Sequence, residues 1–158
     1  MKLGTSTAIA ALALGLATAA EAQQVLASQP QSFVDFFVKE GFRPELTRDP
    51  TGDPMVMFRY EGATEYLLFY DCADHEACRS VQFYAAFPTE SPVALETLNT
   101  WNSGMEGRFM RAYSLDDGAV RLNMDVATSQ DGISERDFRD LLSLWLDRKQ
   151  VFEQTIGF

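Results

Sequence analysis

Histidine, cysteine and basic side chains are scarce in this sequence, and their scarcity narrows the classes of function. The 158 residues include one histidine, two cysteines and 13 Lys and Arg against 23 Asp and Glu, which gives a formal net charge of −10. An acidic chain without a Lys/Arg cluster is a poor ligand for nucleic acid or anionic lipid, because neutralisation of phosphates dominates such affinity. We therefore expect no nucleic-acid partner.

The sequence also lacks the usual marks of a catalytic centre. A serine hydrolase needs a base beside its nucleophile, but the single histidine, His75, lies between the two cysteines, and there is no Gly-x-Ser-x-Gly elbow. No glycine-rich loop for phosphates is present, and no spacing singles out a carboxylate pair. We predict no catalytic residues, no cofactor and no resident metal, and an enzyme of unknown type is the least favoured hypothesis.

Long hydrophobic runs are absent except near the N-terminus. Lys2 precedes the apolar run 8–17, and Ala20-Glu21-Ala22 then gives the small-x-small pattern of a signal-peptidase site. A membrane anchor is the alternative, but the run is about half of the roughly 20 residues that span a bilayer. We expect a signal peptide over 1–22, cleaved after Ala22, and a periplasmic or secreted mature chain without a membrane span.

The pattern of apolar residues predicts one α+β domain over 31–158, after a polar, flexible leader over 23–30. Short alternating segments joined by tight turns indicate an antiparallel sheet of five to six strands, flanked by three helices in the order α-β-β-β-β-α-β-β-α. The strands are expected at 43–48, 55–60, 65–71, 79–87, 107–114 and 119–126.

Capping residues locate the three helices. Ser32 with Asp35, Ser91 followed by Pro92, and Ser134 with Asp137 are each typical of a helix start. Asp116-Asp117-Gly118 predicts the tight turn of the last hairpin. A calcium site is the alternative there, but so short an acidic turn lacks the further ligands that calcium needs.

Cys72 and Cys78 lie at the end of one predicted strand and the start of the next. In an exported protein, two cysteines across the mouth of a hairpin are expected to form a disulfide. A redox-active pair is one alternative, although the spacing is not Cys-x-x-Cys. Zinc is another, with Cys72, His75 and Cys78 as ligands and Asp74 or Glu76 nearby, but oxidation would remove the thiolates that zinc requires.

Four short stretches of the sequence form a characteristic combination: Leu98-Asn99-Thr100-Trp101-Asn102, Arg108-Phe109-Met110-Arg111-Ala112-Tyr113, Asp116-Asp117-Gly118 and Leu122-Asn123-Met124-Asp125-Val126. With them the chain resembles the YbjN family, bacterial proteins labelled sensory transduction regulators, over roughly 31–156. It implies a fold similar to that of type III secretion chaperones, and a protein-binding module that often self-associates. It brings no catalytic residues with it.

These observations favour an exported, non-catalytic binding module, an adaptor or chaperone-like protein of the bacterial envelope whose partner is another protein or a second copy in a homodimer. The candidate recognition patch consists of Trp101, Asn102, Arg108, Arg111 and Tyr113, since Trp, Tyr and Arg are favoured where binding energy concentrates. The competing interpretation makes Trp101 a core residue and Asn102 part of a helix end, and pairs the arginines with Asp116, Asp125 or other acids. The alternative function is binding of a small ligand in a Phe- and Tyr-lined pocket between sheet and helices.

Overall fold

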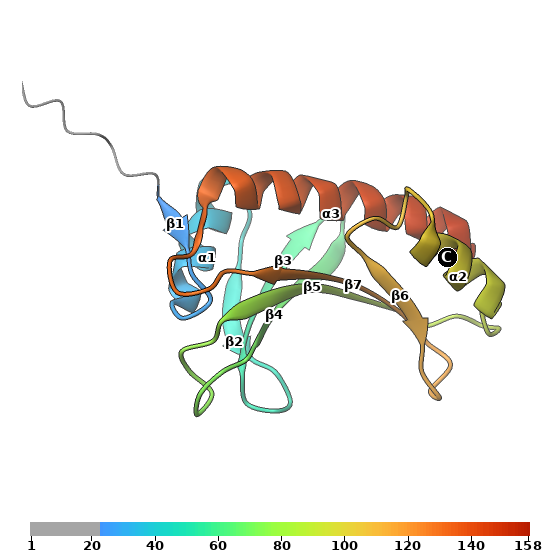
Figure 1. The fold of residues 1–158 in the computed structure, drawn as a ribbon, viewed down its shortest axis with the longest axis horizontal. Helices are drawn as coiled ribbons and strands as arrows, with labels where there is room; N and C mark the ends of the chain where they lie inside the picture. The colour runs from blue at the N-terminus through green and yellow to red at the C-terminus, as the bar shows by residue number, and fades with distance from the viewer. Residues whose placement is uncertain (1–22) are drawn as a thin grey trace, which may run out of the picture.

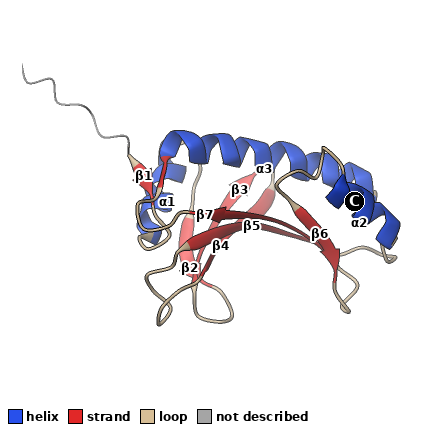
Figure 2. Cartoon of the chain, viewed as in Figure 1, coloured by secondary structure: helices blue, strands red, loops and turns tan. Residues whose placement is uncertain are grey.

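A six-stranded antiparallel sheet with its helices gathered on one side forms the body of the protein (Figures 1 and 2). The computed structural model describes residues 23–158, so the expected signal peptide and its cleavage site at Ala22 lie outside the described residues. The sheet contains β2 (Glu45–Arg48), β3 (Pro54–Tyr60), β4 (Ala63–Tyr70), β5 (Ser80–Phe87), β6 (Arg111–Ser114) and β7 (Val120–Ala127). Their order across the sheet is β2-β3-β4-β5-β7-β6, and every neighbouring pair is antiparallel.

Three helices complete the expected order of elements: α1 (Pro30–Lys39), α2 (Leu95–Ser103) and α3 (Glu135–Ile156). The 22 residues of α3 make a helix roughly 33 Å long, which lies across the full width of the sheet in Figure 1. The α+β fold class, with three helices and a six-stranded antiparallel sheet, is therefore confirmed.

The core lies between the helices and one face of the sheet, and phenylalanine is its most frequent residue. The strand residue Phe83 stacks between Phe138 and Trp145 of α3, at ring-centroid distances of 5.5 and 5.7 Å. The α1 stripe of Phe33, Phe36 and Phe37, predicted from its i, i+3, i+4 spacing, is fully buried. Burial of such rings is the main favourable term in folding, so these contacts fix the helices to this face.

The first described residues differ from the expected flexible leader. β1 (Gln24–Val25) pairs antiparallel with β8 (Ile133–Ser134) in a separate two-stranded sheet beside α1. Val25 and Ala27 are fully buried, and the backbone N–H of Ala27 donates to Oγ1 of Thr128 at 3.1 Å. The correction has a physical reason: isolated apolar residues in a polar stretch give no periodic signal, and their order depends on contacts distant in sequence.

The helix starts were predicted with mixed success. Ser134 caps α3 as expected, because its Oγ accepts from the backbone N–H of Asp137 at 3.1 Å. Ser32 does not cap α1; it lies inside a helix that begins at Pro30, and its Oγ donates to the carbonyl of Gln29. α2 begins after Ala94 without a side-chain cap, so the start expected at Ser91 is corrected by several residues.

Candidate functional site

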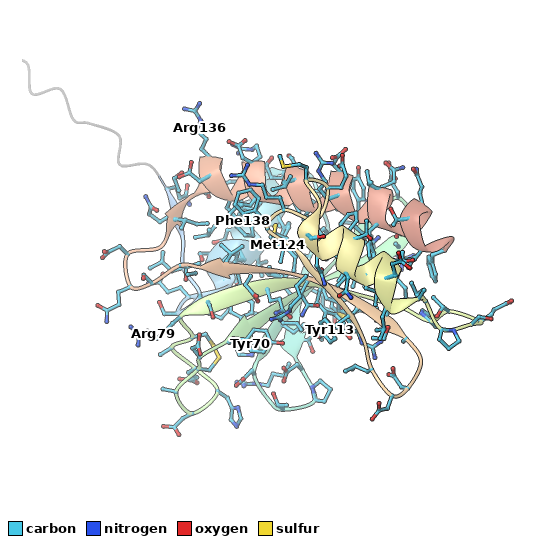
Figure 3. All side chains as sticks on the ribbon, turned by 45° about the vertical axis from the view of Figure 1, so that its right-hand side comes forward. Tyr70, Arg79, Tyr113, Met124, Arg136 and Phe138 are labelled. Carbon is cyan, nitrogen blue, oxygen red and sulfur yellow. A yellow bond between two sulfur atoms is a disulfide. The ribbon has the colours of Figure 1, made fainter. Side chains whose placement is uncertain are left out.

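The helix-free side of the sheet is the candidate functional site. We call it the open face and define it by the strand side chains that alternate with the buried core residues. Figure 3 shows Tyr70 and Tyr113 on this side, whereas Met124 and Phe138 lie between the sheet and α3. The open face consists of Met55, Met57, Arg59, Thr64, Tyr66, Leu68, Tyr70, Gln82, Tyr84, Arg111, Tyr113, Arg121, Asn123 and Asp125.

Aromatic residues divide between the two faces by type. The strand phenylalanines Phe58, Phe69, Phe83 and Phe87 all belong to the core beneath the helices. Four of the five tyrosines, Tyr66, Tyr70, Tyr84 and Tyr113, lie on the open face. A tyrosine ring supplies apolar contact area while its hydroxyl stays hydrated, which is why tyrosine is enriched in interfaces.

The strand register brings the centre of the open face together in a row across the sheet. Met57 lies opposite Tyr66, Tyr66 opposite Tyr84, Tyr84 opposite Asn123, and Asn123 opposite Arg111. The rings of Tyr66 and Tyr84 meet edge to face at 6.5 Å. Residues from five strands therefore form one continuous surface.

Polar contacts hold several of these side chains in place. The hydroxyl of Tyr70 donates to Oε1 of Gln82 at 3.4 Å, and Nε2 of Gln82 donates to Oδ1 of Asp125 at 2.6 Å. Nδ2 of Asn123 donates to the hydroxyl of Tyr113 at 3.3 Å. A surface held in this way is ordered before a partner arrives, which lowers the entropy cost of binding.

Charge and partial burial change the pKa values of two groups on the open face. Burial, together with the nearby Tyr113, Asp49, Asp125 and Tyr84, raises the pKa of Tyr70 above its ordinary value. For Arg121, burial opposes the charge, but the ion pair with Asp117 at 2.6 Å holds its pKa above the ordinary value.

The segment between β4 and β5 borders the open face and contains the disulfide. Cys72 and Cys78 are joined at an S–S distance of 2.08 Å, as the sequence predicted. Both sulfurs are used in this bond, which leaves no thiolate for the zinc alternative. Nδ1 of His75 lies 2.8 Å from Oδ1 of Asp53, so the segment is also attached to the turn between β2 and β3.

The residues of the predicted recognition patch do not share one surface. Trp101 is 4% exposed and packs against Phe152 at 4.8 Å. Asn102 donates from Nδ2 to the carbonyl of Ala112 and accepts on Oδ1 from its backbone N–H, at 2.9 and 2.8 Å. These contacts attach α2 to β6, in agreement with the interpretation of both residues as structural.

The other three patch residues divide between two locations. Arg111 and Tyr113 lie on the open face, with the guanidinium 5.6 Å from the ring centroid. Arg108 lies in the loop between α2 and β6 over the exposed ring of Phe109, and the neighbouring Glu106 pairs with Arg148 of α3. The structure therefore brings Arg111 and Tyr113 together with Tyr66, Tyr84 and Arg121, which the sequence-based patch did not include.

A buried polar cluster on the helix side connects β4 to α3. Glu65 of β4 is 1% exposed; it accepts a hydrogen bond from Nε1 of Trp145 at 3.2 Å and pairs with Nζ of Lys149 at 3.0 Å. Burial opposes the charge of Lys149, but its contacts with Glu153 and Glu65 raise its pKa above the ordinary value. The cluster fixes α3 on the sheet and needs no ligand to satisfy its charges.

The surface hollows over residues 23–158 include three that no phenylalanine lines. One of about 780 Å³ lies at the β2 edge beside α1 and the disulfide segment. Another, of about 380 Å³, opens between the end of β3 and α3, and Tyr60 is its one aromatic residue. The third, of about 440 Å³, lies beside α2, with Trp101 as its one aromatic residue. The Phe- and Tyr-lined pocket of the small-ligand alternative does not correspond to any of these three.

The sheet is covered by helices on one side and is tyrosine-rich and helix-free on the other, and this arrangement defines an α+β fold. No helix over residues 23–158 combines the length and apolarity needed to cross a membrane. Residues 32–158 match the family model of YbjN, described as "Putative bacterial sensory transduction regulator", and the chain belongs to that family. A search of curated proteins finds no match.

Proposed function

We propose that this protein is an exported, non-catalytic protein-binding module of the bacterial envelope, an adaptor or chaperone-like protein, and that the open face is its contact surface. The description of the family as a regulator supports a binding role. The observation that carries the proposal is the row Met57, Tyr66, Tyr84 and Asn123, which continues across neighbouring strands without a covering helix. Such a surface offers large, rigid side chains at a low entropy cost.

Export is proposed on two grounds. The N-terminal pattern that ends at Ala22 is typical of a cleaved signal, and the Cys72–Cys78 bond suits an oxidising compartment. Osmotic-shock fractionation and alkylation of the released protein without reductant test this part. We expect a mature chain that starts at Gln23, with both cysteines protected from alkylation; a cytoplasmic chain with free thiols would contradict export.

Site-specific photo-crosslinking in living cells tests the binding role. A benzophenone amino acid at Tyr84 places the reactive group at the centre of the open face. The same group at Arg136, which Figure 3 shows pointing away from α3 on the opposite side of the molecule, provides the matched control. We expect one dominant protein adduct from position 84 and none from position 136.

The outcomes separate the alternatives. An adduct that contains only this chain would replace the adaptor role with self-association through the open face. Equal adducts from both positions, or no adduct from either, would contradict the assignment of this surface. Native mass spectrometry of the same preparation would then decide whether a small molecule is retained.

A further inference from the structure

The sheet arches away from its helices, so the open face is concave. In Figure 1, β5 and β7 curve with their hollow side opposite α3, and the turns on either side extend beyond it. These are the segment 71–79 and the loop 49–53 at one end, and the hairpin turn between β6 and β7 at the other. A sheet whose backbone curves in this way favours a convex partner on its open face.

The backbone of the sheet offers little room for an added strand. The two edge strands, β2 (Glu45–Arg48) and β6 (Arg111–Ser114), have four residues each. The centre of the open face presents side chains, because the backbone groups of β4, β5 and β7 pair with their neighbours. An α-helix is about 10–12 Å wide and presents its side chains at i, i+3 and i+4 spacing, which matches a concave side-chain surface.

The middle of the open face suits the apolar side of a partner's helix. Met57, Tyr66 and Tyr84 lie in register on three strands, and Met55 lies opposite Leu68 in the next row. Methionine is unbranched and adapts its shape to a partner, whereas tyrosine supplies a rigid apolar ring with a hydrated tip. This combination favours apolar side chains on the occupant.

Arginine occurs at both ends of the tyrosine row, although the chain carries a net charge of −10. Arg59 of β3 lies opposite Thr64, two positions beyond the Met57–Tyr66 pair. Arg121 of β7 lies opposite Ala86, two positions beyond Asn123, and Arg111 of β6 is opposite Asn123 itself, so both belong to the other end of the row. Within residues 23–158, neither Arg59 nor Arg111 forms an ion pair: Arg59 donates to Oγ1 of Thr64 and to the carbonyl of Gly62, and Arg111 lies over the ring of Tyr113, so neither positive charge has a carboxylate partner.

Two polar atoms on the open face lack a hydrogen-bond partner within the described part of the chain. They are Oδ1 of Asn123, a residue 3% exposed, and Nη1 of Arg121. A buried polar group without a partner costs stability, and proteins keep such groups at functional sites more readily than elsewhere. Their place on β7, beside the tyrosine row, supports this part of the face as a point of recognition.

We infer that the open face binds an amphipathic α-helix of the partner protein, with apolar residues on the Met57–Tyr66–Tyr84 row and carboxylates at its two ends, which face Arg59 at one end and Arg111 and Arg121 at the other. The inference rests on the proposed function and adds to it the form and charge of the partner segment. A second copy of this chain is an outcome of the test.

Two labelled synthetic peptides test the chemistry directly. Each is a stabilised helix of about 18 residues, roughly 27 Å long, with leucine along one side. One carries glutamates in its first and last turns and the other carries lysines at the same positions. We expect the glutamate peptide to bind at least about tenfold more tightly by fluorescence anisotropy, with a preference that weakens as salt screens the charges.

A pair of charge-matched variants locates the effect. The double variant Arg59→Glu with Arg111→Glu should abolish the preference for the glutamate peptide. The double variant Arg108→Glu with Arg136→Glu changes the net charge equally but on the helix side, and should retain the preference. All four positions are exposed, and circular dichroism checks that both variants are folded.

Three results would overturn the inference: equal affinity for the two peptides, equal effects of the two double variants, or no binding of either peptide. A dimer at micromolar concentration that Arg59→Glu with Arg111→Glu dissociates would replace the helix with a second copy. The photo-crosslinking result at position 84 does not depend on the outcome of the peptide-binding experiment. A heterologous adduct there, without peptide binding, would retain the proposed function while rejecting a helical occupant.

Discussion

The two faces of the sheet carry aromatic rings that differ by one hydroxyl group: phenylalanine on the helix side and tyrosine on the open face. On the helix side, Phe69 and Phe83 are fully buried beneath α1 and α3. On the open face, Tyr70 and Tyr84 occupy the next position along the same strands. The hydroxyl is the difference: it would require a partner in the core, whereas water or a second protein satisfies it on an open surface. The choice between Phe and Tyr along each strand therefore marks which rings pack in the core and which lie on the open face.

The largest expected contrast comes from neighbouring residues of β5. Phe83→Ala should lower the free energy of unfolding by about 3–5 kcal/mol, because it leaves a cavity between Phe138 and Trp145. Tyr84→Ala, the matched control on the other face, should cost no more than about 1 kcal/mol. Urea unfolding followed by circular dichroism measures both. Similar losses for the two variants would show that the open face contributes to stability as much as the core does.

A smaller effect is expected from the buried ion pair on the helix side. Lys149→Met leaves Glu65 buried without its cation and should cost about 3 kcal/mol. The double variant Glu65→Gln with Lys149→Met removes both charges and should recover more than half of that loss. Should the double variant be no more stable than Lys149→Met, an unpaired charge would not be the reason for the loss.

The smallest effect concerns the protonation of the open face. Because burial and nearby Tyr113 raise the pKa of Tyr70 above its ordinary 10.0, the folded state holds the phenol proton more tightly than the unfolded state. Stability should therefore fall as pH rises above that ordinary value, where the unfolded chain ionises first. Phenolate absorbance should show one tyrosine that titrates late, and Tyr70→Phe should remove it. A late transition that persists in Tyr70→Phe would assign it to another tyrosine.

Local patterns predicted most of the fold. The alternation in 119–126 gives β7 and its buried face, and the cap formed by Ser134 gives the start of α3. The Cys72–Cys78 bond also follows from short-range spacing. β1 and β8 were missed because a strand of two residues has no periodicity and is held by partners more than a hundred residues away.

The candidate site was only partly predictable, because its members come from strands far apart in the sequence. Arg111 and Tyr113 were identified from the family-like motif and do lie on the open face. Trp101 and Asn102 come from the same motif but bind α2 to the rest of the molecule. Sequence proximity placed all of them in one patch, whereas the register placed Tyr66 and Tyr84 beside Asn123 and Arg111.

The sequence by itself determined the α+β class, the family, the disulfide and the segments that form the strands, because each depends on neighbouring residues or on a short repeat. Only the tertiary structure decided which side of the sheet the helices cover and which side chains meet on the other. The physical reason is that alternation assigns residues to two faces within one strand, but the pairing of strands and the docking of α3 determine which faces coincide.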